Sequence, residues 1–173
     1  MRSKKRYSNA TFSKRVDHEA GRHRGPRAAS EPSICSTCGA VYCDRRWTPA
    51  GTPKKGGKHK HWNPQSITVC PACKKKQEGL PAGFVYVSGD FLTSHRPEIE
   101  HLLDKEAERA GVDNPLARVM KRKMDESGRL VISTTTEHLA QRLGHALEKA
   151  FQGEVRYDFS HENKLARVYW HRD

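Results

Sequence analysis

The sequence lacks long hydrophobic runs. No stretch approaches the ~18–20 apolar residues that a membrane-spanning helix needs. Residues Met1 to Arg6 lead into no hydrophobic core, so they do not have the pattern of a secretory signal. Hydrophobic residues make up 35% of the 173 residues, which allows a modest core. We therefore expect a cytoplasmic protein with no membrane partner.

Acidic residues are scarce in the N-terminal part of the chain. Residues 1–76 contain 18 of the 32 Lys and Arg residues but only 4 of the 20 Asp and Glu residues, a net charge of +14. The following 97 residues contain 14 basic and 16 acidic residues, a net charge of −2. Solubility does not require charges to segregate in this way. The asymmetry therefore predicts a polyanion-binding region joined to an ordinary folded domain.

Composition divides the chain into three parts. Residues 1–33 have almost no large apolar side chains, so they cannot bury enough surface to offset the entropy of ordering, and we expect a disordered basic tail. Residues 34–80 hold two cysteine pairs and, between them, a basic loop rich in Gly, Pro, Lys and His. Residues 81–173 have the patterning of a compact domain.

The compact domain alternates strand and helix patterns. Strands are expected at 84–88, 130–133, 155–159 and 165–170, and helices at 97–111 and 137–150, the latter opened by the capping-box spacing of Thr134 and Glu137. Asn114-Pro115 predicts a further short helix, with Leu116, Val119, Met120 and Met124 on one face and Gly128 past its end. The order β-α-α-β-α-β-β predicts an α+β fold, a two-layer sandwich with helices on one face of a mixed sheet.

Four of the five cysteines form two Cys-x-x-Cys pairs, Cys35 with Cys38 and Cys70 with Cys73. A two-residue spacer lets both thiolates of one turn reach the same ion, and four thiolates leave zinc no open position. The pairs therefore predict a zinc ribbon with one structural Zn²⁺; redox-active or merely buried cysteines are the weaker alternative. Cys43 has a looser spacing and is expected to be a packed or free thiol, and His59 and His61 are less favoured ligands.

Cations interleave with aromatic residues around the cysteine pairs. Lys and Arg release counterions from phosphates, and tryptophan rings stack on unpaired bases. No recognition-helix motif is present, so RNA is favoured over duplex DNA. The predicted nucleic-acid-binding residues are Lys4, Lys5, Arg6, Lys14, Arg15, Arg22, Arg24, Arg27, Arg45, Arg46, Trp47, Lys54, Lys55, Lys58, Lys60, His61, Trp62, Lys74, Lys75 and Lys76.

The second half of the chain resembles a known family. The resemblance rests on Leu130 to Thr136, Leu139-Ala140, Leu143-Gly144, Phe151 to Val155 and Arg167 to Trp170, together with the cysteine pairs. Residues 34–170 are similar to the NMD-three family of ribosome-associated zinc proteins, and above all to its small single-ribbon prokaryotic relatives. The family's export adaptor has more zinc-binding cysteines and further domains, so nuclear export is not implied. The resemblance implies contact with the large ribosomal subunit or its rRNA.

The expected function is that of a non-enzymatic ribosome-binding factor. It would act in large-subunit assembly, or in hibernation by blocking translation on idle ribosomes; ribosomal proteins and tRNA are further expected partners. One alternative is a His-Asn-His nuclease with His61 as general base, although the second catalytic His or Asn is missing after Cys73. Another is a DNA-binding, transcription-associated zinc ribbon. No Gly-rich phosphate loop is present, so ATP hydrolysis is not expected.

Overall fold

The computed structural model describes residues 32–43, 46–51, 66–160 and 165–173. Within them the chain forms two separate sheets, a four-stranded sheet near the cysteines and a five-stranded sheet in the second half. All but the last two residues of the predicted disordered tail, 1–33, lie outside the described residues. No helix within the described ranges is both long and apolar enough to cross a membrane.

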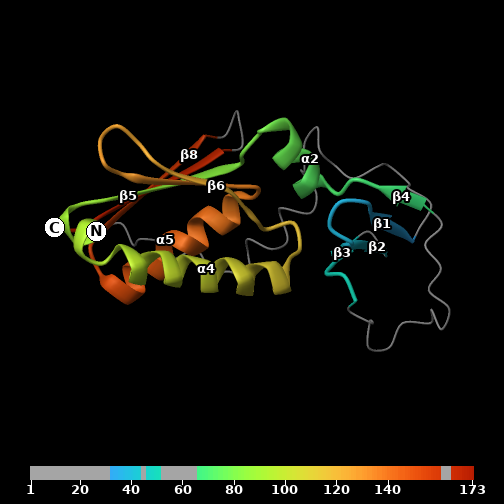
Figure 1. The fold of residues 1–173 in the computed structure, drawn as a ribbon, viewed down its shortest axis with the longest axis horizontal. Coiled ribbons are helices and arrows are strands. Elements are labelled where there is room, and N and C mark those ends of the chain that lie inside the picture. The colour runs from blue at the N-terminus through green and yellow to red at the C-terminus, as the bar shows by residue number, and fades with distance from the viewer. Residues whose placement is uncertain (1–31, 44–45, 52–65, 161–164) are drawn as a thin grey trace, which may run out of the picture.

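The four-stranded sheet and one helix form what we call the cysteine module, residues 32–79. Its strands are β1 (Ser33–Cys35), β2 (Val41–Cys43), β3 (Arg46–Thr48) and β4 (Ser66–Thr68), in the order β3-β2-β1-β4. Only β1 and β4 run parallel among these strands. Helix α2 (Pro71–Glu78) follows β4 and leads towards the larger sheet, as Figure 1 shows.

The second half forms the α/β module, residues 82–173. Its elements are β5 (Gly83–Ser88), α3 (Asp90–Ser94), α4 (Arg96–Asp113), β6 (Val119–Met124), β7 (Leu130–Thr134), α5 (Glu137–Phe151), β8 (Glu154–Ser160) and β9 (Leu165–His171). The strand order is β6-β7-β5-β9-β8, with β5 and β9 parallel and the other neighbours antiparallel. The predicted fold class, α+β with a mixed sheet, is confirmed.

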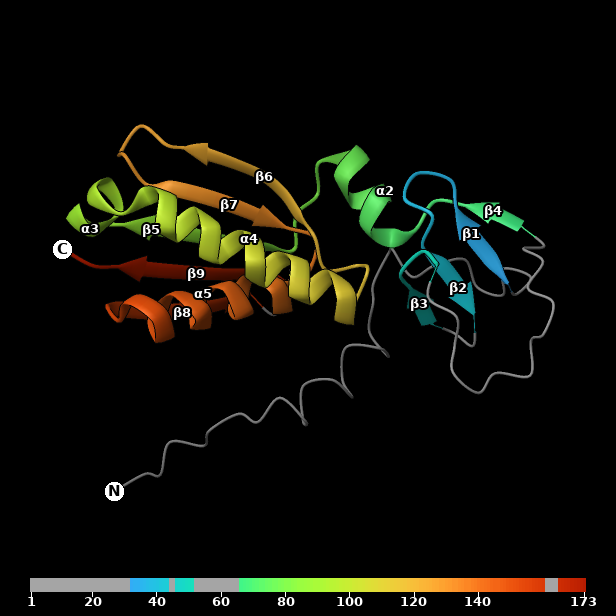
Figure 2. The same cartoon turned by 60° about the horizontal axis from the view of Figure 1, so that its bottom comes forward.

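The core of the α/β module lies between the sheet and the two long helices. Helices α4 and α5 both cover one face of the sheet, which Figures 1 and 2 show from two sides. Val85, Val87, Val168 and Trp170 from the central strands are fully buried beneath them. Helix α5 approaches β9 closely at Gly144, where an added Cβ would lie 2.4 Å from Cγ1 of Val168. The buried positions alternate along β5 and β9, as a sheet covered on one face requires, whereas Leu130, Val131 and Ile132 of β7 are all buried.

One predicted helix is wrong. Residues 119–124 form strand β6, which pairs antiparallel with β7. The turn between them is closed by Gly128, which has φ of 74° and donates its N–H to the Asp125 carbonyl oxygen. The helical spacing of Val119, Met120 and Met124 was misleading because a short apolar pattern fits both structures, and here pairing with β7 satisfies the backbone hydrogen bonds.

The start of α5 also differs from the prediction. Its N-cap is Thr136, whose hydroxyl accepts the Leu139 N–H at 3.2 Å, and not Thr134. The Thr134 hydroxyl instead donates to the Thr136 carbonyl oxygen at 2.8 Å. Two helices were not expected from the sequence, α2 and the short α3.

Candidate metal centre and its basic surroundings

Both cysteine pairs converge on one point. The sulfur atoms of Cys35, Cys38, Cys70 and Cys73 all lie within 4.8 Å of one another. Those of Cys38 and Cys70 are 3.7 Å apart. Cys35, Cys70 and Cys73 are buried and Cys38 is partly buried. The four sulfurs therefore form a cage that can hold one metal ion. Four sulfur ligands would complete the coordination of a tetrahedral ion such as Zn²⁺.

Local backbone structure sets the position of each pair. The first pair lies in a tight turn after β1, in which Gly39 has φ of 71° and donates its N–H to the Cys35 carbonyl oxygen at 2.9 Å. The second pair begins α2: Cys70 is the N-cap and Pro71 occupies the first helical turn. Proline is favoured there because the N–H it lacks would have no partner within the helix. A helix start thus replaces the simple turn expected for the second pair.

Backbone N–H groups point at two of the sulfurs. The Cys70 N–H donates to the Cys35 sulfur at 3.2 Å, and the Cys73 N–H donates to the Cys70 sulfur at 3.4 Å. Burial opposes ionisation of the Cys35 thiol, but backbone hydrogen bonds from Cys70, Cys38 and Thr37 outweigh it and lower its pKa to about 6. Burial raises the pKa of the Cys70 and Cys73 thiols. The cage therefore favours ionisation of some thiols over others, and a cation would be needed to deprotonate all four.

Arg118 of the α/β module supplies a positive charge beside the sulfurs. One of its guanidinium nitrogens lies 3.8 Å from the Cys73 sulfur, and its Nε donates to the Pro115 carbonyl oxygen at 2.7 Å. Burial alone would lower the pKa of Arg118, but the neighbouring thiolates, Cys38 first, raise it. Sequence reasoning missed this residue because it placed 115–127 in a helix. Arg118 lies 45 positions after Cys73 in the chain, so no local sequence pattern links the two residues.

The loop that carries Arg118 is fixed by Thr135, which is 1% exposed. Its hydroxyl donates to the Leu116 carbonyl oxygen at 2.5 Å and accepts the Arg118 N–H at 2.8 Å. Its own N–H donates to the Arg118 carbonyl oxygen at 2.9 Å. The Thr-Thr-Thr run therefore has a structural role: the first residue braces the turn, the second holds the arginine loop and the third caps α5.

A second contact joins the modules at Lys75. Its ammonium group donates to the Thr135 carbonyl oxygen at 2.9 Å, and Leu116 packs against the small core of the cysteine module. Burial lowers the pKa of Lys75, although Glu137 acts in the opposite direction. Lys75 is therefore engaged at the junction between the modules, and its role as a phosphate contact stays a prediction.

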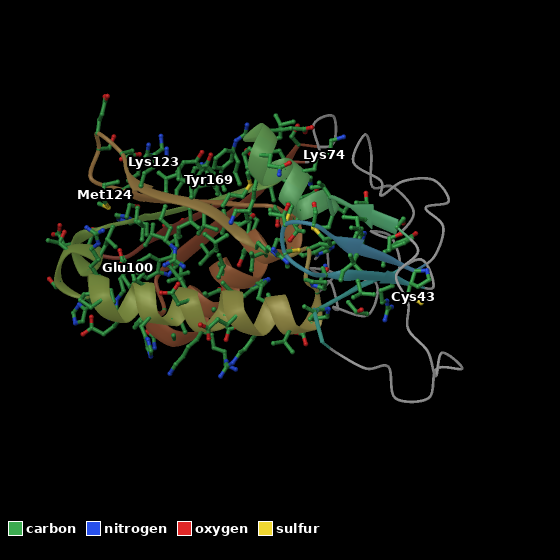
Figure 3. All side chains as sticks on the ribbon, turned by 45° about the vertical axis from the view of Figure 1, so that its right-hand side comes forward. Cys43, Lys74, Glu100, Lys123, Met124 and Tyr169 are labelled. Atoms are coloured by element: carbon green, nitrogen blue, oxygen red, sulfur yellow. The ribbon has the colours of Figure 1, made fainter. Side chains whose placement is uncertain are left out.

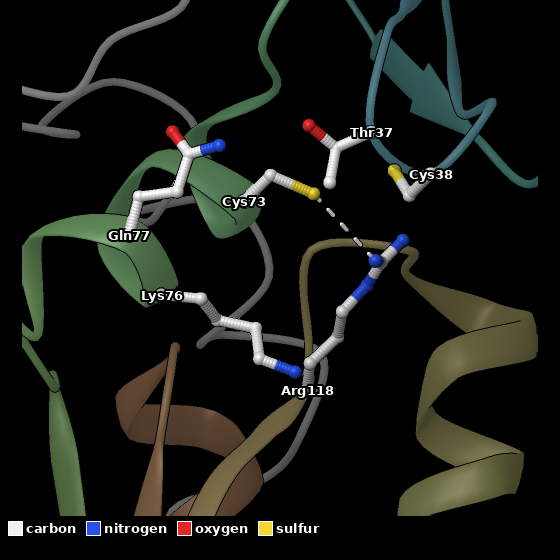
Figure 4. A pocket seen from close by; sticks show the side chains of 6 residues that line it. All are labelled: Thr37, Cys38, Cys73, Lys76, Gln77 and Arg118. Carbon is white, nitrogen blue, oxygen red and sulfur yellow. Dashed lines mark hydrogen bonds between the residues drawn. The ribbon is translucent and has the colours of Figure 1, made fainter.

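A shallow cleft of about 270 Å³ opens beside the cysteine cage, between the two modules. Figure 4 shows its walls: Thr37, Cys38 and Cys73 from the cage, Lys76 and Gln77 from α2, and Arg118 opposite them. The cleft joins the metal centre to two cationic side chains. We assign no ligand to it.

Of the predicted nucleic-acid-binding residues, five fall within the described ranges. Arg46, Lys74 and Lys76 are exposed, and Lys74 lies 3.9 Å from Glu78 on the same helix. Trp47 is only 7% exposed and packs against Tyr42 with ring centroids 5.3 Å apart, so its predicted role in stacking on bases is wrong. Its ring is needed in the core because the described residues of the cysteine module include few other large apolar side chains.

The other predicted contacts lie outside the described residues. These are Lys4, Lys5, Arg6, Lys14, Arg15, Arg22, Arg24, Arg27, Arg45, Lys54, Lys55, Lys58, Lys60, His61 and Trp62, and His59 also lies there. Cys43, by contrast, is described: it is buried at the end of β2 and is not one of the cage cysteines. The expectation of a packed thiol is confirmed.

Comparison with models of protein families, with curated proteins and with solved structures finds no match to this chain. The site must therefore be interpreted from its own geometry and charge.

Proposed function

We propose that this chain is a non-enzymatic ribosome-binding factor that holds one structural Zn²⁺ and contacts rRNA of the large subunit through the basic surface of its cysteine module. The observation that carries the proposal is the position of the four-sulfur cage inside the basic part of the chain. Residues 1–76 have a net charge of +14, and all four cage cysteines lie among them.

Zinc is the metal that fits the cage best. Four thiolates at the usual Zn–S length of about 2.3 Å form a tetrahedron whose sulfurs are about 3.8 Å apart. The 3.7 Å separation of the Cys38 and Cys70 sulfurs is close to that value. Four thiolates around Zn²⁺ carry a net charge of −2, which the guanidinium of Arg118 partly offsets. Metal analysis of the purified chain should find about one zinc ion per molecule.

The cage would hold the basic side chains of α2 in a fixed geometry. Lys74 and Lys76 follow Cys73 directly and are exposed, and Arg46 is exposed on the edge strand β3. Fixed cations gain more from phosphate contacts than mobile ones because less side-chain and backbone freedom is lost on binding. The resemblance to ribosome-associated zinc proteins supports the ribosome as the polyanion, with a role either in large-subunit assembly or in hibernation.

Co-sedimentation with ribosomes tests the proposal. The chain should pellet with large-subunit particles, and the pelleted fraction should fall steeply as salt rises, because each phosphate contact releases counterions. Lys74→Glu with Lys76→Glu should weaken pelleting, whereas Lys105→Glu with Lys149→Glu, an equal charge change on exposed positions of α4 and α5, should not. Failure of the unmodified chain to pellet at physiological salt would contradict the proposal.

A further inference from the structure

The five-stranded sheet has a second face that helices α4 and α5 do not cover. On β5, Val85 and Val87 point into the core, so Phe84 and Tyr86 point to the other face. Tyr169 pairs with Tyr86 and shares that face. In Figure 3, Tyr169 and Lys123 lie on the side of the molecule away from Glu100 of α4. We call this surface the open face; no helix of the described part of the chain lies over it (Figures 1 and 2).

A row of aromatic and cationic side chains crosses the centre of the open face. The rings of Tyr86 and Tyr169 stack with centroids 4.9 Å apart and planes 10° from parallel, and Phe84 lies 6.1 Å from Tyr86. The guanidinium of Arg129 is 5.6 Å from the Tyr86 ring centre, and that of Arg156 is 4.6 Å from the Tyr169 ring centre. Each end of the tyrosine pair is therefore capped by an arginine.

Cations gather on this face although the region around it is acidic overall. Residues 77–173 have 14 basic and 16 acidic residues. By strand alternation and register, the open face carries Lys121, Lys123, Arg129, Arg156 and Arg167 against Asp125, Glu154 and Asp158. The open face therefore has a net positive charge. The remaining residues of 77–173 have a net charge more negative than the −2 of the whole segment. Packing of the module's core does not account for this cluster of positive charge, which is complementary to a polyanion.

We propose that the open face binds unpaired bases of a single-stranded RNA segment, a contact that rests on the proposed function in taking RNA to be the partner. A sheet of five strands is about 19 Å wide, which accommodates a short segment laid across the strands. Sheets with exposed aromatic residues on their central strands stack two or three bases in this way. Duplex RNA hides its bases within the helix, so the open face should discriminate against it.

The positions of Arg129 and Arg156 suggest where a base binds in the row of rings. A base stacks on the outer face of Tyr169 by displacing the guanidinium of Arg156, which then pairs with the adjoining phosphate. Arg129 is held by Asp125, to which its Nε donates at 2.8 Å, so it stays in place at the other end of the row. Lys121 and Lys123, exposed on the edge strand β6, are placed to contact the backbone of the segment.

The surface also continues towards the cysteine module. Lys74 of α2 lies along the same side of the molecule as Lys123 and Tyr169 in Figure 3. The hydrogen bond from Lys75 to Thr135, which follows β7 directly, fixes α2 at the near end of the sheet. One RNA can therefore contact both modules, with phosphates near α2 and unpaired bases on the sheet.

Binding of a fluorescent eight-nucleotide uridine RNA to the full chain, measured by anisotropy, tests the inference. Lys121→Glu with Lys123→Glu should weaken binding about tenfold or more, because two phosphate contacts become repulsive. The charge-matched variant Lys105→Glu with Lys149→Glu should change it little. A duplex of the same length should bind the unmodified chain more weakly. Equal losses in both variants, or equal binding of the duplex, would overturn the inference.

Stacking is tested at the tyrosines. Tyr169→Leu should reduce the affinity for the uridine RNA about fivefold or more, whereas Tyr169→Phe, which retains the ring, should change it little. Aromatic NMR signals of the unmodified chain give a second readout that does not depend on how the leucine variant folds. The ring protons of Tyr86 and Tyr169 should shift on titration with the RNA, while those of the buried Trp170 should not. Unshifted tyrosine signals at saturating RNA would contradict the contact.

These outcomes are separable from the test of the proposed function. If the unmodified chain does not pellet with ribosomes but still binds the uridine RNA at the tyrosines, the ribosome proposal fails and the open-face inference stands. If it pellets and the open-face variants behave like their controls, the inference fails alone. Concentration-dependent dimerisation lost in Tyr169→Leu, without RNA binding at that position, would instead assign the open face to self-association and overturn the inference.

Discussion

The two modules differ in what holds them together. In the α/β module, sixteen buried residues form one hydrophobic cluster, all but Ala117 from strands and helices. Among the described residues of the cysteine module, the cluster has six buried residues, of which three are cage cysteines, with Trp47 as the one large side chain. Burying large apolar side chains stabilises a fold by ~1.5–3 kcal/mol each. The first module can therefore fold through packing alone, whereas the second needs a cross-link among its cysteines.

The largest expected effect comes from removing the metal. Chelation, or Cys70→Ser, should unfold the cysteine module and leave the α/β module folded, because structural zinc sites contribute on the order of 10 kcal/mol to small domains. NMR spectra should show loss of the dispersed Trp47 indole signal and retention of the Trp170 signal. Cys43→Ser, which alters a buried cysteine outside the cage, is the control. Simultaneous loss of both indole signals would show that the modules do not differ as we describe.

The converse change is Leu143→Ala in α5. Leu143 is 0% exposed and belongs to the large core, so truncation should cost the α/β module ~2–5 kcal/mol of unfolding free energy. Urea denaturation followed by far-ultraviolet circular dichroism measures this cost. Metal retention under chelator competition should stay the same. Lys149→Ala on the exposed side of α5 is the control, and a similar loss there would mean that core packing is not the cause.

Arg118→Met tests whether the α/β module supports the metal centre. Removing the charge and the N–H group beside the Cys73 sulfur should weaken metal retention about 10–100-fold, the usual effect of losing a hydrogen bond to a ligand. Competition with a chromogenic chelator measures it. Arg122→Met is the matched control, because Arg122 pairs with Asp104 away from the cage. Equal retention in both variants would show that the cage does not depend on Arg118.

The smallest expected effect is at the junction of the modules. Lys75→Met removes one hydrogen bond to the Thr135 carbonyl oxygen and should cost about 1 kcal/mol. Hydrogen exchange of the α2 amides in the metal-loaded chain measures the change, which should appear as several-fold faster exchange. Lys74→Met, on the neighbouring exposed position, should have less effect. If Lys74→Met accelerates exchange equally, the change is a property of α2 and not of the junction.

Strong local patterns predicted most of the elements of the α/β module. Six elements lie within a few residues of their expected positions: the strands β5, β7, β8 and β9 and the helices α4 and α5. Their hydrophobic patterns extend along most of each segment and are therefore easy to recognise. β6 was missed because a short apolar segment fits both periods. Trp47 was misassigned because an aromatic residue among arginines has the same local signature whether it packs inward or outward.

The sequence by itself determined the four cysteines that can hold a metal ion and the segregation of charge, since a two-residue cysteine spacing and a count of charged residues do not depend on distant contacts. Only the tertiary structure decided which side chains share a surface. It buried Trp47, joined Lys75 to the Thr135 carbonyl oxygen, placed Arg118 beside the Cys73 sulfur, and brought Tyr86 and Tyr169 together. Those placements follow from strand pairing and packing between residues tens of positions apart, which local sequence patterns do not encode.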